Sequence, residues 1–104
     1  MSKNDILGTW KSFMTTGLGG NPQAYDRQSL TFASFGSGTM NSKTLFGRKR
    51  DFDWEYVPEG PYGYDYFIIR NLGGPGAVAM GSIEDGGSTL VVLEGSMMTA
   101  YRRQ

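Results

Sequence analysis

The chain opens with Leu7-Gly8-Thr9-Trp10 and closes with Thr99-Ala100-Tyr101-Arg102-Arg103, and these two stretches decide the fold that we expect. Between them, glycine clusters recur at short intervals and divide the chain into segments of strand length. Glycine tolerates the positive φ of a tight turn, so this spacing is typical of an antiparallel meander. Because the two stretches bracket the meander as its first and last strands, we expect a closed β-barrel.

Length and composition fit one small globular domain spanning residues 1–104. Hydrophobic residues make up 38% of the chain and aromatic residues 13%, which supplies large side chains for a core. The pattern predicts an all-β, antiparallel, up-and-down barrel of about eight short strands. An open β-sandwich would use the same strands and is the alternative. The expected strands are Thr9–Thr15, Ser29–Phe35, Thr39–Phe46, Phe52–Tyr56, Tyr64–Arg70, Ala77–Ile83, Ser88–Glu94 and Met97–Arg102.

The clearest alternation lies in Phe52-Asp53-Trp54-Glu55-Tyr56, where aromatic and acidic residues take opposite faces. The following strand is expected to pair with it, so that Tyr66 and Ile68 share the aromatic face. Together with Phe32, this face predicts a wall of five side chains that hold a ligand: Phe32, Trp54, Tyr56, Tyr66 and Ile68. The segment from Gly17 to Arg27 is long for a connection between two strands.

The Gly8-x-Trp10 opening and the basic residues of the last strand resemble the lipocalin-like (calycin) barrels, and in particular the compact bacterial domains of that kind. The resemblance implies that Trp10 plugs one end of the barrel and that Arg102 or Arg103 packs over its ring. It also implies that the loop after the first strand, Gly17 to Arg27, lies across the open mouth, above the ligand. Such a cation–π contact stabilises a fold by roughly 0.5–2 kcal/mol. Residues 2–7 are expected to form a short helical turn over that end, with Ser2 and Asp5 as caps.

The residues that are absent exclude most familiar active sites. The chain has no cysteine and no histidine, which removes thiolate nucleophiles, the commonest general base and the commonest metal ligand. We expect neither a metal nor a cofactor. Ten basic and ten acidic residues balance, so no nucleic-acid or membrane partner is expected. The basic run Arg48-Lys49-Arg50 is interpreted as a solvated turn or strand edge, because acidic residues follow it.

The chain has no apolar segment of about 20 residues that could cross a bilayer, and residues 1–5 lead into the fold without the apolar region of a signal peptide. We therefore expect a cytoplasmic protein.

The leading functional hypothesis is non-enzymatic binding of a small apolar or aromatic molecule in the barrel mouth. A protein-interaction module, such as an inhibitor or assembly factor, is the alternative. In that case the loop from Pro58 to Tyr64 would present Tyr62 and Tyr64 to a partner protein, and the barrel would be filled.

An enzymatic role is the third hypothesis and has the least support from the sequence. Its acid–base groups would be Tyr56, Tyr66 and Asp65. Strict alternation predicts that Asp65 points away from both tyrosines, which leaves this hypothesis without a positioned pair.

Overall fold

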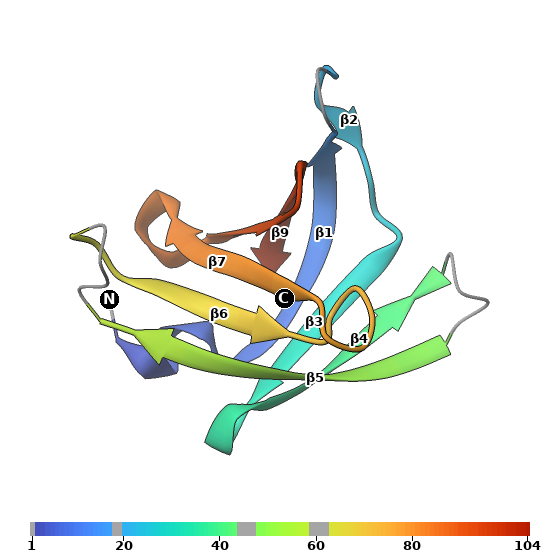
Figure 1. Ribbon diagram of the computed structural model, residues 1–104. Helices are drawn as coiled ribbons and strands as arrows, with labels where there is room; N and C mark the ends of the chain where they lie inside the picture. Colours follow the sequence, from blue (N-terminus) through green and yellow to red (C-terminus); the bar gives the residue numbers. More distant parts are fainter. Residues whose placement is uncertain (1, 18–19, 44–47, 59–62) are drawn as a thin grey trace.

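The computed structural model describes residues 2–17, 20–43, 48–58 and 63–104, and these residues form a closed antiparallel β-barrel (Figure 1). Its eight main strands follow one another in chain order, and the two-residue strand β2 (Gln23–Ala24) adds to β1. The main strands are β1 (Gly8–Thr16), β3 (Gln28–Ala33), β4 (Ser37–Ser42), β5 (Arg48–Val57), β6 (Tyr66–Arg70), β7 (Val78–Glu84), β8 (Thr89–Glu94) and β9 (Met97–Arg103).

Closure comes from the pairing of β9 with β1, which lie side by side in Figure 1. Trp10 stands opposite Arg103 at one end of this seam, and Thr16 stands opposite Met98 at the other. The register shifts between Ser12 and Met14, so β1 carries one additional residue, Phe13, as a β-bulge. The predicted up-and-down barrel is confirmed, and the open sandwich is wrong.

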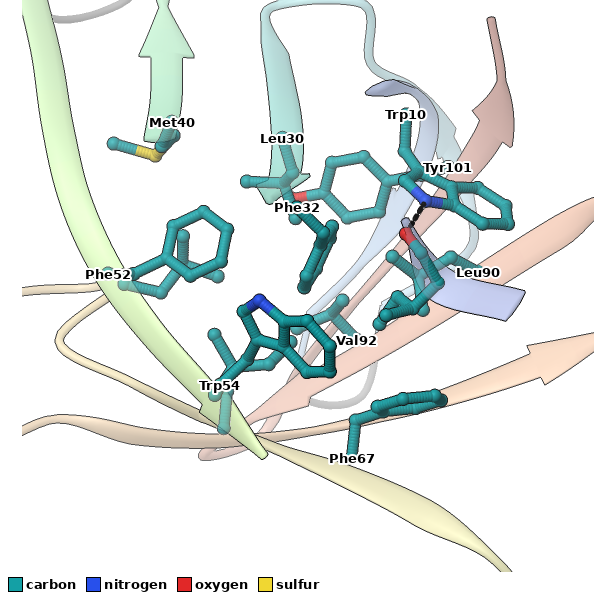
Figure 2. Packing of buried hydrophobic residues seen from close by; sticks show 14 residues of the cluster. Trp10, Leu30, Phe32, Met40, Phe52, Trp54, Phe67, Leu90, Val92 and Tyr101 are labelled. Atoms are coloured by element: carbon teal, nitrogen blue, oxygen red, sulfur yellow. Dashed lines mark hydrogen bonds between the residues drawn. The ribbon is translucent and has the colours of Figure 1, made fainter. Parts of the chain in front are cut away.

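The barrel interior is filled by aromatic side chains over much of its length (Figure 2). The Phe32 ring meets the rings of Phe52 and Trp54 edge-on, with centroid distances of 5.0 and 6.0 Å. Trp54 in turn lies 6.0 Å from Phe67. Edge-on contacts of this kind stabilise a core beyond the burial of apolar area, by about 0.5–1.5 kcal/mol per pair.

The two ends of the barrel differ in how they are covered. The 3-10 helices η1 (Lys3–Ile6), η2 (Ser34–Gly36) and η4 (Asp85–Gly87) all lie at the end where β1 begins, which we call the closed end. The opposite end, which we call the mouth, carries β2 and the turn between β8 and β9. Within the residues described, no helix is both long and apolar enough to span a membrane.

Trp10 occupies the closed end with no exposed surface. Its indole N–H donates to the carbonyl oxygen of Ile6 at 2.9 Å, which ties the strand to η1. The guanidinium of Arg103 lies 4.1 Å from the centre of the Trp10 ring and donates to the carbonyl oxygens of Leu7, at 3.0 Å, and Asp5. It is thus Arg103 that covers the tryptophan. Arg102 instead covers the ring of Phe13, at 4.0 Å.

The turn between β3 and β4 falls earlier than the sequence pattern indicates. Phe35, expected at the end of a strand, adopts a positive φ of 66° in η2 and is 96% exposed. Gly38, which belongs to a glycine cluster expected to form a turn, instead lies buried inside β4. The expected end of that strand, Phe46, lies outside the described residues.

Candidate ligand-binding site

The predicted wall of five side chains does not form, because β6 directs Phe67 and Ile69, and not Tyr66 and Ile68, into the barrel. On β5 the alternation places Trp54 and Tyr56 on the inner face, as predicted. The pairing puts Phe67 opposite Tyr56, so Tyr66 and Ile68 lie on the outer face. This part of the prediction is wrong. The residues of β6 are apolar or aromatic on both faces, so their pattern does not decide which face is buried.

The inner members of the predicted wall are part of the packed core. Phe32 is 2% exposed and Trp54 is 4% exposed. The indole N–H of Trp54 donates to the carbonyl oxygens of Ala33, at 3.0 Å, and Ser37, at 2.8 Å. The backbone therefore satisfies the polar atom that the sequence hypothesis left for a ligand or water.

Tyr56 reaches the closed end, where its hydroxyl donates to a carboxylate oxygen of Asp65 at 2.5 Å. The prediction that Asp65 points away from the tyrosines is therefore wrong. Asp65 precedes the first residue of β6, so strand alternation does not fix the direction of its side chain. The pair lies at the end of the barrel opposite the mouth.

A cavity of about 310 Å³ lies at the mouth, above the aromatic core. It is bordered by the ends of strands that meet there, including Thr15 of β1 and Thr99 of β9. Its apolar lining is Met40, Leu72, Val92 and Met97. Its polar lining is dominated by Tyr25, Gln28, Ser42, Arg50, Glu94 and Tyr101. A small set of polar groups converging on an apolar hollow is typical of a ligand site.

A hydrogen-bonded network holds one side of this cavity. The side-chain amide of Gln28 donates to the hydroxyl oxygen of Tyr101 at 2.7 Å, and the backbone N–H of Gln28 donates to the hydroxyl of Ser12 at 3.1 Å. The hydroxyl of Tyr25 approaches the amide oxygen of Gln28 at 3.5 Å. Tyr101 is only 1% exposed, and this burial raises the pKa of its phenol far above the usual value. The phenol is therefore neutral and keeps its proton.

Two charged side chains, Arg50 and Glu94, also border the cavity. Arg50 donates from Nη1 to the carbonyl oxygen of Leu72 at 3.3 Å. Glu94 lies so close to Gly73 that a Cβ added to that glycine would be 2.8 Å from the Glu94 Cδ. Within the described part of the chain, the buried Oε2 of Glu94 has no hydrogen-bond partner. An unpaired buried acceptor costs about 1–3 kcal/mol, and more when it is charged.

The sequence interpretation missed Arg50, Gln28 and Glu94 as site residues. Arg50 was assigned to a solvated turn or edge, and this is wrong for its side chain, which borders the cavity. The signal was present in the same alternation that identified the core. Arg50 lies two residues before Phe52 on the inner face of β5, and Glu94 lies two residues after Val92 on β8.

The segment from Gly17 to Arg27 lies beside the mouth in the part that the structure describes. Its short strand β2 pairs with β1, and the backbone N–H of Tyr25 donates to the carbonyl oxygen of Phe13 at 3.1 Å. Tyr25 is thereby placed in the cavity lining.

The described residues of the interaction-module loop, Pro58, Gly63 and Tyr64, lie at the closed end. Tyr64 is 54% exposed, and its ring centre is 6.2 Å from that of Tyr66. Tyr62 lies outside the described residues. A second groove of about 330 Å³ lies beside Lys11, Arg27 and Lys43, and it shares Gln28 and Ser42 with the lining of the mouth cavity.

Comparisons with known proteins bear on the fold alone. No protein-family model matches the chain, and a search of curated proteins gives no match. Among solved structures, the chain is similar to a lipocalin-like protein from Bacteroides uniformis. The TM-score is 0.65 and the sequence identity is 18%, and the match covers 96% of this chain and 99% of the other. Together with the barrel closed by β1 and β9, this similarity shows that the chain has the lipocalin-like fold.

Proposed function

We propose that the protein binds one small molecule with an apolar or aromatic body in the mouth cavity, without converting it chemically. The observation that supports this most is the cavity itself, with its volume of about 310 Å³. This volume lies at the small end of the range of about 300–1,000 Å³ that is typical of ligand sites.

In this proposal the ligand approaches from the mouth, since Trp10 and η1 cover the closed end. Its apolar part contacts Met40 and Val92, and the flexible thioether of methionine adapts to different shapes. Phe32 and Trp54 form the packed base beneath the ligand. A cavity of about 150 Å³ holds one benzene molecule, so this one suits a single ring with a short substituent.

The test is a titration of small aromatic compounds, fatty acids, retinoids, flavins and tetrapyrroles, followed by isothermal calorimetry and tryptophan fluorescence. Single-ring compounds are expected to bind, and tetrapyrroles are expected to be too large. Thr99→Trp places a large ring among the mouth residues and is expected to weaken binding by at least about tenfold. The matched control is Met98→Trp, one residue away on the outer face, which is expected to keep the wild-type affinity.

The proposal would be overturned in two ways. One is that no member of the panel binds. The other is that binding persists unchanged in Thr99→Trp, which would place the ligand elsewhere on the protein.

The interaction-module hypothesis stays a prediction, and Tyr64 is its accessible residue. We further propose that the protein is cytoplasmic and that its partner is a small molecule rather than a nucleic acid or a membrane. Fractionation of the native source tests the location.

A further inference from the structure

We propose that the ligand of the mouth cavity is an arylalkylamine, one aromatic ring with a short aminoalkyl chain, whose protonated amine binds the carboxylate of Glu94. This inference rests on the proposed function, because it names the chemical class of the molecule that the cavity takes.

The argument begins with the unsatisfied acceptor. Oε2 of Glu94 is buried and has no hydrogen-bond partner among the described residues. Two donors of the cavity lining are engaged with other acceptors: Gln28 donates to Tyr101, and Arg50 donates to the carbonyl oxygen of Leu72. A ligand with a hydrogen-bond donor would satisfy the unpaired oxygen of this carboxylate, and a cationic donor gives the strongest hydrogen bond.

The carboxylate can turn toward such a donor. Its Cδ lies against Gly73, which has no side chain to hold the group in one orientation. The terminal torsion of a glutamate is broad and soft, so a modest rotation presents Oε2 to the cavity.

Other side chains of the cavity lining also accept hydrogen bonds. An ammonium group carries three donors, and one carboxylate oxygen satisfies only one of them. The hydroxyl oxygens of Tyr25 and Thr15 border the same cavity and supply further acceptors. The phenol of Tyr101 is kept neutral by its burial, so it adds no second negative charge.

The other residues of the cavity lining indicate which ring and which net charge the ligand has. Met40 and Val92 offer an apolar surface for a ring. Arg50 is the cation of the cavity lining and disfavours a second positive charge on the ligand. We therefore expect monoamines to bind better than diamines of the same size.

The experiment compares three probes of matched shape by calorimetry: 2-phenylethylamine, 2-phenylethanol and 3-phenylpropanoate. The amine is expected to bind at least about tenfold more tightly than the other two. Glu94→Gln is expected to weaken amine binding by at least about tenfold and to leave the affinity for 2-phenylethanol within about threefold. Glu84→Gln, an exposed position at the closed end, is the matched control and is expected to change none of the affinities.

Thermal unfolding of Glu94→Gln verifies that the variant folds, and Glu94→Ala provides a second variant. If all three probes bind equally, and neither Glu94 variant changes this while Thr99→Trp abolishes it, the amine assignment is overturned and the proposed function stands. If no probe binds and the wider panel fails as well, both are overturned.

Discussion

At the scale of single residues, Gly38 shows how closely the core packs against the backbone. A Cβ at this position would clash with the ring of Phe52 and would lie 2.8 Å from the carbonyl oxygen of Thr31. Neither neighbour can withdraw easily, because the ring is buried and the oxygen belongs to β3. Gly38→Ala is therefore expected to lower the free energy of unfolding by about 1–3 kcal/mol, measured by urea denaturation.

Gly17→Ala is the matched control for that measurement. Gly17 has no atom within 4 Å of an added Cβ, and its φ is not positive. The substitution is expected to change stability by less than about 0.5 kcal/mol. Equal effects at the two glycines would contradict the packing of Phe52 against β4.

The burial of Tyr101 predicts how the stability of the protein changes at alkaline pH. Its phenol titrates normally, with a pKa near 10.0, when the chain is unfolded, but burial raises its pKa in the fold. Above about pH 10 the unfolded chain therefore loses a proton that the folded chain keeps, and stability falls as pH rises. The slope from one such group reaches about 1.4 kcal/mol per pH unit.

Tyr101→Phe removes this ionisation. Its free energy of unfolding is expected to be lower than that of the wild type at pH 8, because the hydrogen bond from Gln28 is lost, but to decline less steeply between pH 10 and 12. Urea denaturation at a series of pH values measures both slopes. Parallel curves would show that Tyr101 does not contribute to the alkaline loss of stability.

At the scale of the elements, the pairing of β1 with β9 distinguishes a closed barrel from an open sandwich. A strand at an open edge leaves half of its backbone groups unpaired, whereas a closed seam pairs them. Amides of β1 and β9 are expected to exchange with deuterium as slowly as those of β5 and β7. Exchange is expected to start at the bulge around Phe13, where the register shifts.

Hydrogen exchange followed by NMR resolves these amides one by one. Uniformly fast exchange along both seam strands, with protection elsewhere, would contradict closure of the barrel.

The elements also show what the sequence could and could not predict. The alternation in β5 fixed the inner face because acidic residues separate Phe52, Trp54 and Tyr56. The same reasoning failed one strand later, where Tyr66, Phe67 and Ile68 are all apolar or aromatic. Hydrophobic pattern thus predicts a strand more readily than its orientation.

The site was harder to predict than the fold for a physical reason. Its charged residues, Arg50 and Glu94, stand at the mouth ends of their strands, where inner and outer positions both reach water. Composition assigns such residues to the surface, and only the three-dimensional closure of the barrel places them around one cavity.

At the scale of the whole molecule, the barrel is expected to unfold as a single unit. Its radius of gyration is 12.9 Å, close to the value of about 13 Å that a chain of this length has when it folds as one compact domain. Far-ultraviolet circular dichroism and tryptophan fluorescence are therefore expected to give the same denaturation midpoint. Two separate midpoints would show that part of the chain folds independently.

The placement of η1 over the closed end also determines how the protein is oriented when it is tethered to a surface. The backbone N–H of Gln104 donates to the carbonyl oxygen of Thr9 at 2.9 Å, and residues 3–6 lie over the same end, so the first and last described segments of the chain both lie there (Figure 1). A tether at either end would extend away from the cavity. Molecules anchored to a sensor chip through a terminal tag would therefore hold their mouths toward the flowing solution, and one fixed through the mouth rim would not.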